Sequence, residues 1–109
     1  QKDLVEFMNA NYMFNAPLEH FAEFSGRSLS TFRREFIRLF GVTPNKWLID
    51  TRLEVAYHKI AEERQRPSDI YWELGFETLA HFSRKFKEKY HMAPSQLKGD
   101  DLDADVPAL

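Results

Sequence analysis

The sequence predicts an all-α fold of about seven helices, in which two helix-turn-helix subdomains are joined by a long central helix. Three observations support this prediction. Apolar residues recur at helical spacing along most of the 109-residue chain. The four Gly and five Pro leave few breaks between these periodic segments. A short helix, a glycine turn and a longer basic helix occur twice, about 50 residues apart.

The composition excludes several classes of protein. A chain with 15% aromatic residues, ten of them Phe, is too apolar to be disordered. The lack of cysteine excludes a disulfide framework and a thiolate zinc site, and it fits a reducing compartment. No apolar run approaches the roughly 18 residues of a membrane span, and the start QKDLVEF is unlike a signal peptide. Because no Met begins the sequence, we expect a fragment of a longer protein.

The first three predicted helices fall at residues 3–13, 18–24 and 29–40. Ser28 can cap the third helix and Gly41 can end it. The apolar residues that indicate the first helix are Leu4, Val5, Phe7, Met8 and Tyr12. At 100° per residue, the third helix gathers an apolar stripe of Leu29, Phe32, Phe36, Leu39 and Phe40. Its opposite face carries Ser30, Thr31, Arg34 and Arg38.

The remaining helices start with the Thr43-Pro44 pair, a capping hydroxyl followed by a proline suited to a first turn. With no breaker before Pro67, this helix is expected to run for roughly 20 residues, or about 30 Å. Its expected buried stripe is Trp47, Leu48, Leu53, Ala56, Tyr57 and Ile60. A short helix then ends by Leu74, before Gly75, and another spans residues 78–90. On the latter Leu79, Phe82, Phe86 and Tyr90 form the stripe opposite His81, Arg84 and Glu88. A last short turn begins at Pro94.

These elements divide the chain into a first subdomain (1–42), a linking helix (43–66), a second subdomain (67–98) and an acidic tail (99–109) that reads as disordered. The net charge of −2 conceals an uneven distribution, because the tail alone holds four Asp. Residues 27–38 and 84–89 each carry a net charge of +3. Clustered charge is usually only a solvated surface.

The repeat gives these charges a second interpretation. A shift of 50 places Phe32, Arg34 and Phe36 on Phe82, Arg84 and Phe86, while Gly26 and Gly75 are 49 apart. Two such units on a helix of about 30 Å can bring two basic helices near the roughly 34 Å between successive major grooves of DNA. Because Arg binds the guanine edge through two hydrogen bonds, Arg34 and Arg84 are candidates for base contact.

The segments GRSLSTFRREFIRLFGVTPNKWL and IYWELGFETLAHFSRKFKEKYHMAPSQL resemble the DNA-binding domain of the AraC/XylS transcription regulators. The resemblance covers about residues 1–98, and its GFE…HFSRKFK…P pattern is specific to that family. It implies a seven-helix, homeodomain-like pair that binds specific double-stranded DNA in the bacterial cytoplasm, most often as an activator. It also implies RNA polymerase as a partner, and a separate sensing or dimerising domain that this chain lacks.

The resemblance also implies which residues meet DNA. The base-contacting set is Ser30, Thr31, Arg33 and Arg34 in the first unit and Leu79, Ala80, His81 and Arg84 in the second. The phosphate-contacting set is Ser28, Arg38, Thr78, Ser83, Lys85 and Lys87, where helix N-termini add their dipoles. Periodicity agrees for most positions, but it places Arg33 at the edge of the apolar stripe and Leu79 in the core.

Three positions depart from the pattern of the family or of the first copy. Tyr71 stands where the family prefers a small residue and the first copy has Ala22, so we expect the second subdomain to be splayed or repacked. Trp72 adds an aromatic patch that could face a partner. His91 occupies the place of Gly41, which requires a helix end that tolerates a β-carbon.

Two other functions are alternatives to DNA binding. Catalysis is not expected, because the sequence has no HExxH, nucleophile elbow or phosphate loop. Glu77 and His81 have a faintly metal-like spacing of four residues, but such a pair alone does not indicate a site, so neither a metal nor a cofactor is predicted. The serious alternative is a protein-interaction module that uses the same basic helix faces to bind an acidic partner, without a specific DNA site.

Overall fold

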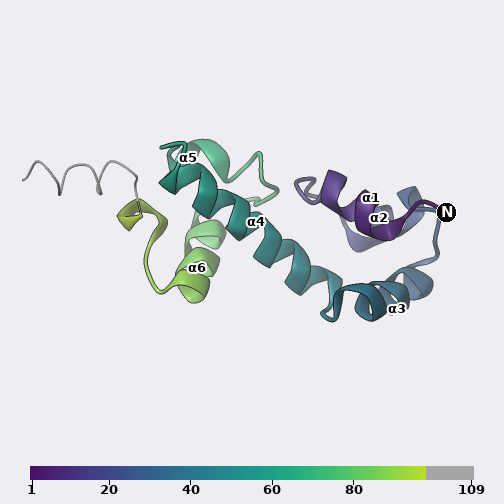
Figure 1. The fold of residues 1–109 in the computed structure, drawn as a ribbon. Helices are drawn as coiled ribbons and strands as arrows, with labels where there is room; N and C mark the ends of the chain where they lie inside the picture. The colour runs from purple at the N-terminus through teal and green to yellow at the C-terminus, as the bar shows by residue number, and fades with distance from the viewer. Residues whose placement is uncertain (98–109) are drawn as a thin grey trace, which may run out of the picture.

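The computed structural model describes residues 1–97 and is wholly helical over that range (Figure 1). The acidic tail predicted for residues 99–109 lies outside the described residues. The predicted count holds there, with six α-helices and one 3-10 helix. They are α1 (Leu4–Asn11), α2 (Leu18–Phe24), α3 (Leu29–Phe40), α4 (Pro44–Ala61), α5 (Pro67–Ile70), α6 (Leu79–Tyr90) and η1 (Pro94–Gln96).

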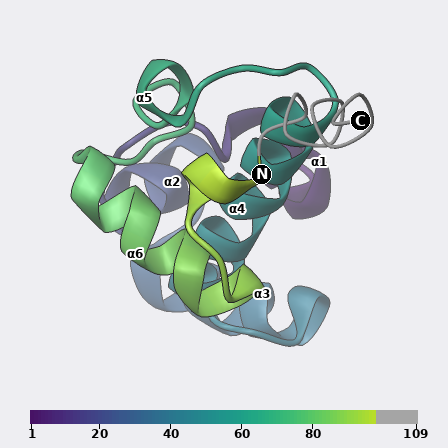
Figure 2. The same ribbon diagram turned by 90° about the vertical axis from the view of Figure 1, so that its left-hand side faces the viewer.

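The molecule has two hydrophobic cores, one at each end of α4, and its extents are 58 × 23 × 21 Å. The first core contains Leu4, Met8, Phe21, Ala22, Phe32, Phe36 and Leu48. The second contains Leu53, Ala56, Ile60, Ile70, Leu74, Phe76, Phe82 and Phe86. Since α4 supplies residues to both cores, it is a structural part of each subdomain as well as the link between them. Figures 1 and 2 show α3 and α6 along the same, lower side of the molecule.

The repeat seen in the sequence is reproduced in the backbone hydrogen bonds of the two turns. In the first turn the N–H groups of Ser25, Gly26 and Arg27 donate to the carbonyls of Phe21, Glu23 and Ala22. In the second, those of Leu74, Gly75 and Phe76 donate to Ile70, Trp72 and Tyr71. Every donor and acceptor is shifted by 49. The two turns therefore share one geometry.

Of the two expected effects of Tyr71, a splayed or a repacked second subdomain, the structure shows local repacking without splaying. The Tyr71 carbonyl accepts from Phe76 N–H at 3.0 Å, as the Ala22 carbonyl accepts from Arg27 N–H at 2.9 Å. The phenol is half-buried at the margin of the second core. The accommodation is local: α5 ends at Ile70 instead of reaching Leu74, and the chain turns so that Leu74 and Phe76 are both buried.

The predicted helix ends are largely confirmed. The side chains of Ser28, Thr43 and Thr78 each accept a hydrogen bond from the backbone N–H three residues later, at 3.0–3.3 Å. Gly41 and His91 both end their helices in the left-handed conformation, with φ of 76° and 60°. A β-carbon is thus tolerated at the second helix end, where L-residues are disfavoured.

Several sequence-based details are corrected by the packing. The linking helix ends at Ala61 rather than continuing to Arg66, because Arg64 is left-handed (φ 57°) and Arg66 is extended before Pro67. Leu39 and Tyr57 are exposed although the sequence places both in apolar stripes that face the core, and Val5 of α1 is exposed as well. The neighbouring elements cover a narrower strip of each helix than its apolar residues occupy. On α3, for example, Phe40 lies against Phe36 and Trp47 and closes that side of the core.

Candidate DNA-binding surfaces

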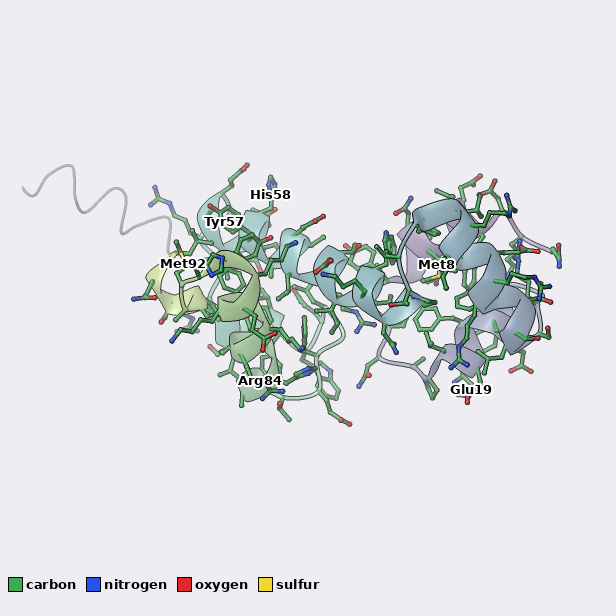
Figure 3. The ribbon with its side chains drawn as sticks, turned by 90° about the horizontal axis from the view of Figure 1, so that it is seen from below. Met8, Glu19, Tyr57, His58, Arg84 and Met92 are labelled. Carbon is green, nitrogen blue, oxygen red and sulfur yellow. The ribbon has the colours of Figure 1, made fainter. Side chains whose placement is uncertain are left out.

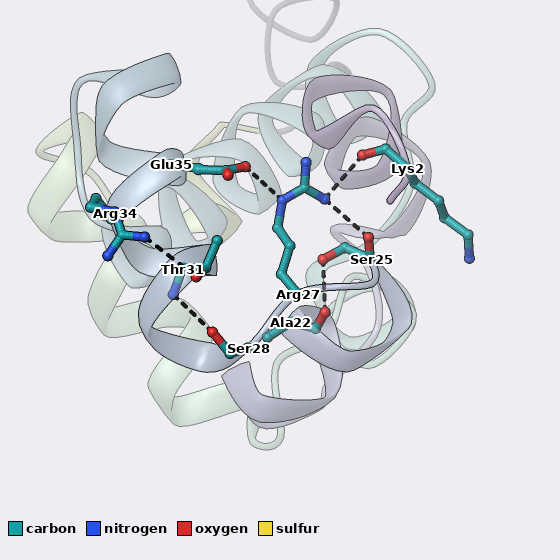
Figure 4. A network of polar contacts seen from close by, with 8 residues as sticks. All are labelled: Lys2, Ala22, Ser25, Arg27, Ser28, Thr31, Arg34 and Glu35. Atoms are coloured by element: carbon teal, nitrogen blue, oxygen red, sulfur yellow. Dashed lines mark hydrogen bonds and ion pairs between the residues drawn. The ribbon is translucent and has the colours of Figure 1, made fainter.

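The outer face of α3 is built by burial of its inner face. Phe32 and Phe36 have no exposed surface, so the opposite side of the helix is directed outward. Ser30, Arg33 and Arg34 are exposed, and Thr31 is half-buried. Arg33 is therefore a surface residue, although periodicity placed it at the edge of the apolar stripe. An Arg34 guanidinium N–H donates to Thr31 Oγ1 at 3.4 Å (Figure 4), so these two polar groups lie side by side.

Arg27 belongs to the basic segment of the sequence but not to this face. Its side chain donates to Glu35 at 2.7 Å and to the carbonyls of Lys2 and Ser25 at 3.0 Å (Figure 4). The hydrogen bond from Arg27 lowers the pKa of the Glu35 carboxyl, and the charges of Arg38 and Arg34 act in the same direction. The charges of Arg27 and Glu35 cancel each other, and the bond from Arg27 to the Lys2 carbonyl holds the N-terminal segment in place. The outer face keeps three exposed cations, Arg33, Arg34 and Arg38.

The outer face of α6 is built in the same way around buried Phe82 and Phe86. Leu79, Ala80 and Arg84 are exposed and His81 is half-buried. Leu79 is 38% exposed, so the core position that periodicity gave it is wrong. It is the first residue of the helix and extends past the core. Figure 3 shows Arg84 at the edge of the second subdomain when the molecule is seen from below.

His81 is held at the margin of this face by an aromatic contact. Its ring meets Phe76 edge-on, with 5.6 Å between centroids. Burial lowers the pKa of His81 below its usual 6.5, and the neighbouring charges of Arg84 and Lys85 lower it further. The imidazole is therefore neutral at pH 7 and carries one donor and one acceptor nitrogen.

The predicted phosphate-contacting residues flank the two faces. Arg38 and Lys87 are exposed, and Ser83 and Lys85 are half-buried. Ser28 and Thr78 already accept capping hydrogen bonds from Thr31 N–H and His81 N–H. A hydroxyl that accepts a hydrogen bond keeps its own O–H as a donor. Capping and phosphate contact by these two residues are thus compatible.

Lys89 contributes to the basic segment of the sequence but points into the α4–α6 interface. Its ammonium lies 3.8 Å from Asp50 and 3.7 Å from Glu54, both on α4. The second face is accordingly less basic than residues 84–89 indicate. Lys85 is paired with Glu88 on the same helix, at 3.4 Å, and 36% of its side chain remains exposed.

Sequence reasoning missed one buried charged residue, Arg52. It is 7% exposed and donates from Nε to the Tyr12 carbonyl at 2.7 Å and from Nη2 to the Phe14 carbonyl at 2.9 Å. Burial lowers the pKa of its guanidinium. A signal was available, because Leu48, Arg52, Ala56 and Ile60 follow one another at intervals of four along a single helix face.

Glu77 is exposed, and residues 1–97 contain no group of three or more His, Asp or Glu side chains arranged to hold a metal. Within the same residues, no helix combines the length and apolar character needed to cross a membrane.

Two equivalent turns, each followed by an exposed basic helix, define a tandem helix-turn-helix protein. The model of the helix-turn-helix domain family matches residues 21–99. The chain therefore belongs to this family, as a DNA-binding domain of the AraC/XylS type.

Individual relatives agree with this assignment. The chain is 28% identical over 98 residues to the virulence regulon transcriptional activator VirF of Yersinia enterocolitica. The aligned residues make up 90% of this chain and 36% of that protein. The chain is 27% identical over 90 residues to the transcriptional regulator ExsA of Pseudomonas aeruginosa, covering 83% and 32%. The chain thus spans about a third of the length of these relatives.

Solved structures support the fold. The DNA-binding domain of AdpA, determined in complex with a target DNA, superimposes with a TM-score of 0.80 at 21% identity, covering 88% of this chain and 89% of that one. The C-terminal domain of the response regulator yesN from Fusobacterium nucleatum gives 0.78 at 23% identity, covering 86% and 92%.

Proposed function

We propose that this chain binds a specific double-stranded DNA site with α3 and α6 in two successive major grooves. Ser30, Thr31, Arg33 and Arg34 contact bases in one half of the site. Leu79, Ala80, His81 and Arg84 do so in the other half. Because the two sets differ in chemistry, the preferred site is asymmetric.

The observation that carries this proposal is the matched placement of two exposed basic helices on one side of the molecule (Figures 1 and 2). The 18-residue α4 between them is about 27 Å long. That length, with the width of the two subdomains added, suits recognition helices about 34 Å apart, the repeat of the major groove. An acidic protein partner would need no such repeat.

In the proposed DNA complex, Ser28, Arg38, Thr78, Ser83, Lys85 and Lys87 contact phosphates and fix the register of the two helices. The whole protein is a bacterial regulator that activates transcription through contact with RNA polymerase. The activation of transcription rests on the transcriptional activator VirF as a relative, and the contact with RNA polymerase rests on the resemblance to the AraC/XylS regulators. A sensing or dimerising domain outside this chain completes the protein.

Selection of random duplexes on the purified chain tests the proposal. Two engaged helices should enrich an asymmetric motif of about 17–20 base pairs, whereas one engaged helix gives fewer than about 10. The failure of every duplex to bind at low salt would refute DNA recognition by this chain.

A competition experiment separates DNA recognition from the interaction-module alternative. The selected duplex is bound by the chain and challenged with unrelated duplex or with polyglutamate at equal charge. If the faces read DNA, the selected duplex should withstand both competitors, since base contacts add specificity to the phosphate attraction. Equal displacement of the selected duplex by polyglutamate and by unselected DNA would favour an acidic protein partner.

A further inference from the structure

Arg52 lies where the two subdomains meet. It projects from the middle of α4, between Leu48 of the first core and Leu53 of the second. Its two hydrogen bonds reach back to the carbonyls of Tyr12 and Phe14, in the loop that joins α1 to α2. Tyr12 itself packs against both cores. This loop of the first subdomain is therefore fastened to the centre of the linking helix.

The turn of the second subdomain closes on the same guanidinium. A β-carbon built on Gly75 would lie 2.9 Å from Arg52 Cζ, 2.9 Å from Arg52 Nε and 2.9 Å from the carbonyl oxygen of Met13. Gly75 is thus in direct contact with both α4 and the α1–α2 loop. Three segments meet here: residues 12–14, Arg52, and the turn that precedes α6.

The equivalent turn of the first subdomain makes no such junction. Gly26 has the same turn hydrogen bonds as Gly75 and a similar φ, 86° against 100°. A β-carbon on Gly26 would come within 3.2 Å of the Cα of Gln1, the first residue of the chain. The repeat therefore supplies an internal comparison, in which one glycine turn touches the other subdomain and its counterpart does not.

We propose that Arg52 and Gly75 lock the two subdomains together, so that α3 and α6 keep a fixed separation and orientation. Arg52 is then a positioning residue that sets the half-site spacing the protein accepts. The packing of α4 alone constrains the first subdomain weakly, because the residues that α4 gives to the first core, Trp47 and Leu48, lie near its N-terminal end. The lock removes that freedom by joining the first loop to the second turn directly. This inference rests on the proposed function only for its consequence at DNA.

The lock can be measured without DNA, because the chain has no cysteine and accepts two spin labels at chosen sites. Leu39→Cys on α3 and Glu88→Cys on α6 are both exposed positions. Pulsed electron paramagnetic resonance should give one narrow distance distribution for the otherwise unchanged 109-residue chain. Arg52→Met removes the two hydrogen bonds, and Gly75→Ala displaces the guanidinium. Both should broaden the distribution, while Gly26→Ala, with the same positive-φ strain, should leave it narrow.

The same variants without labels test the consequence for DNA. On a duplex with both half-sites at the selected spacing, Arg52→Met should bind about tenfold more weakly if one molecule in ten keeps the competent orientation. Insertion of two base pairs between the half-sites should weaken the unmodified chain strongly and Arg52→Met much less. Binding to a single half-site should be unchanged, because neither recognition face is altered.

Each outcome has a defined meaning. An Arg52→Met chain with a narrow distance distribution and undiminished spacing preference would overturn the lock. So would loss of the helical circular-dichroism signal in both Arg52→Met and Gly75→Ala but not in Gly26→Ala, since the junction would then be needed for folding itself. A broadened distribution in a protein that binds no duplex would leave the lock in place and refute the proposed function instead.

Discussion

The salt dependence of DNA binding should reflect which basic side chains the fold leaves outward. The sequence places eight Arg and Lys in the two basic segments, but Arg27 is engaged with Glu35 and Lys89 lies between Asp50 and Glu54. Six are left to meet phosphates or groove edges: Arg33, Arg34, Arg38, Arg84, Lys85 and Lys87. If each of the six neutralises about one phosphate charge, whether it lies at the backbone or reaches a base edge in the groove, the slope of log K against log salt is about −5, whereas eight cations would give about −7.

Fluorescence anisotropy with a labelled duplex measures this slope. Affinity should fall about 10³-fold between about 50 and 200 mM salt for six contacts, compared with about 10⁴-fold for eight. Lys87→Ala should reduce the slope by about 1 on every sequence. Its matched control is Lys89→Ala on the same helix, which should leave the slope unchanged. A slope that falls as much for Lys89→Ala as for Lys87→Ala would refute this division of the basic residues.

Three further outcomes follow from individual side chains. Arg34→Ala and Arg84→Ala should each cost about 1–3 kcal/mol on the selected site and relax the preference at one base pair, in different halves of a repeated selection; an unchanged motif would exclude base contact by that residue. The pKa of His81 lies below 6.5 in the folded chain, so as the pH falls the imidazole is protonated first in the unfolded chain. Protonation then favours the unfolded chain, and the free energy of unfolding decreases as the pH falls through 6.5. Urea unfolding should show this loss, and His81→Gln should lessen it; an imidazole NMR titration at or above 6.5 would contradict the argument. His91→Gly should raise the free energy of unfolding by about 0.5–1 kcal/mol, because a left-handed residue with a β-carbon is strained, and no gain in urea unfolding would show that the strain is relieved elsewhere.

The sequence by itself determined the helices and their order. Three helix starts are predicted by capping side chains that accept a hydrogen bond from the backbone N–H three residues later: Ser28, Thr43 and Thr78. One helix end is predicted by Gly41. These signals depend on residues close together in the sequence, so they can be recognised before the fold is known. The repeat was equally accessible, and with it the paired positions of Arg34 and Arg84 on exposed helix faces.

Only the tertiary structure decided which residues of an apolar stripe are buried in a core, and which residues of a charge cluster face outward. Leu39 and Leu79 fit a helical period yet are exposed, because periodicity gives a direction around the helix and not the extent of the neighbour that covers it. Arg27 and Lys89 have the same charge as Arg34, but Arg27 is engaged with Glu35 and the Lys2 carbonyl, and Lys89 lies against Asp50 and Glu54 of α4. Arg52 depends on carbonyl groups about 40 residues away in the α1–α2 loop, and a contact between distant segments exists only once the chain has folded.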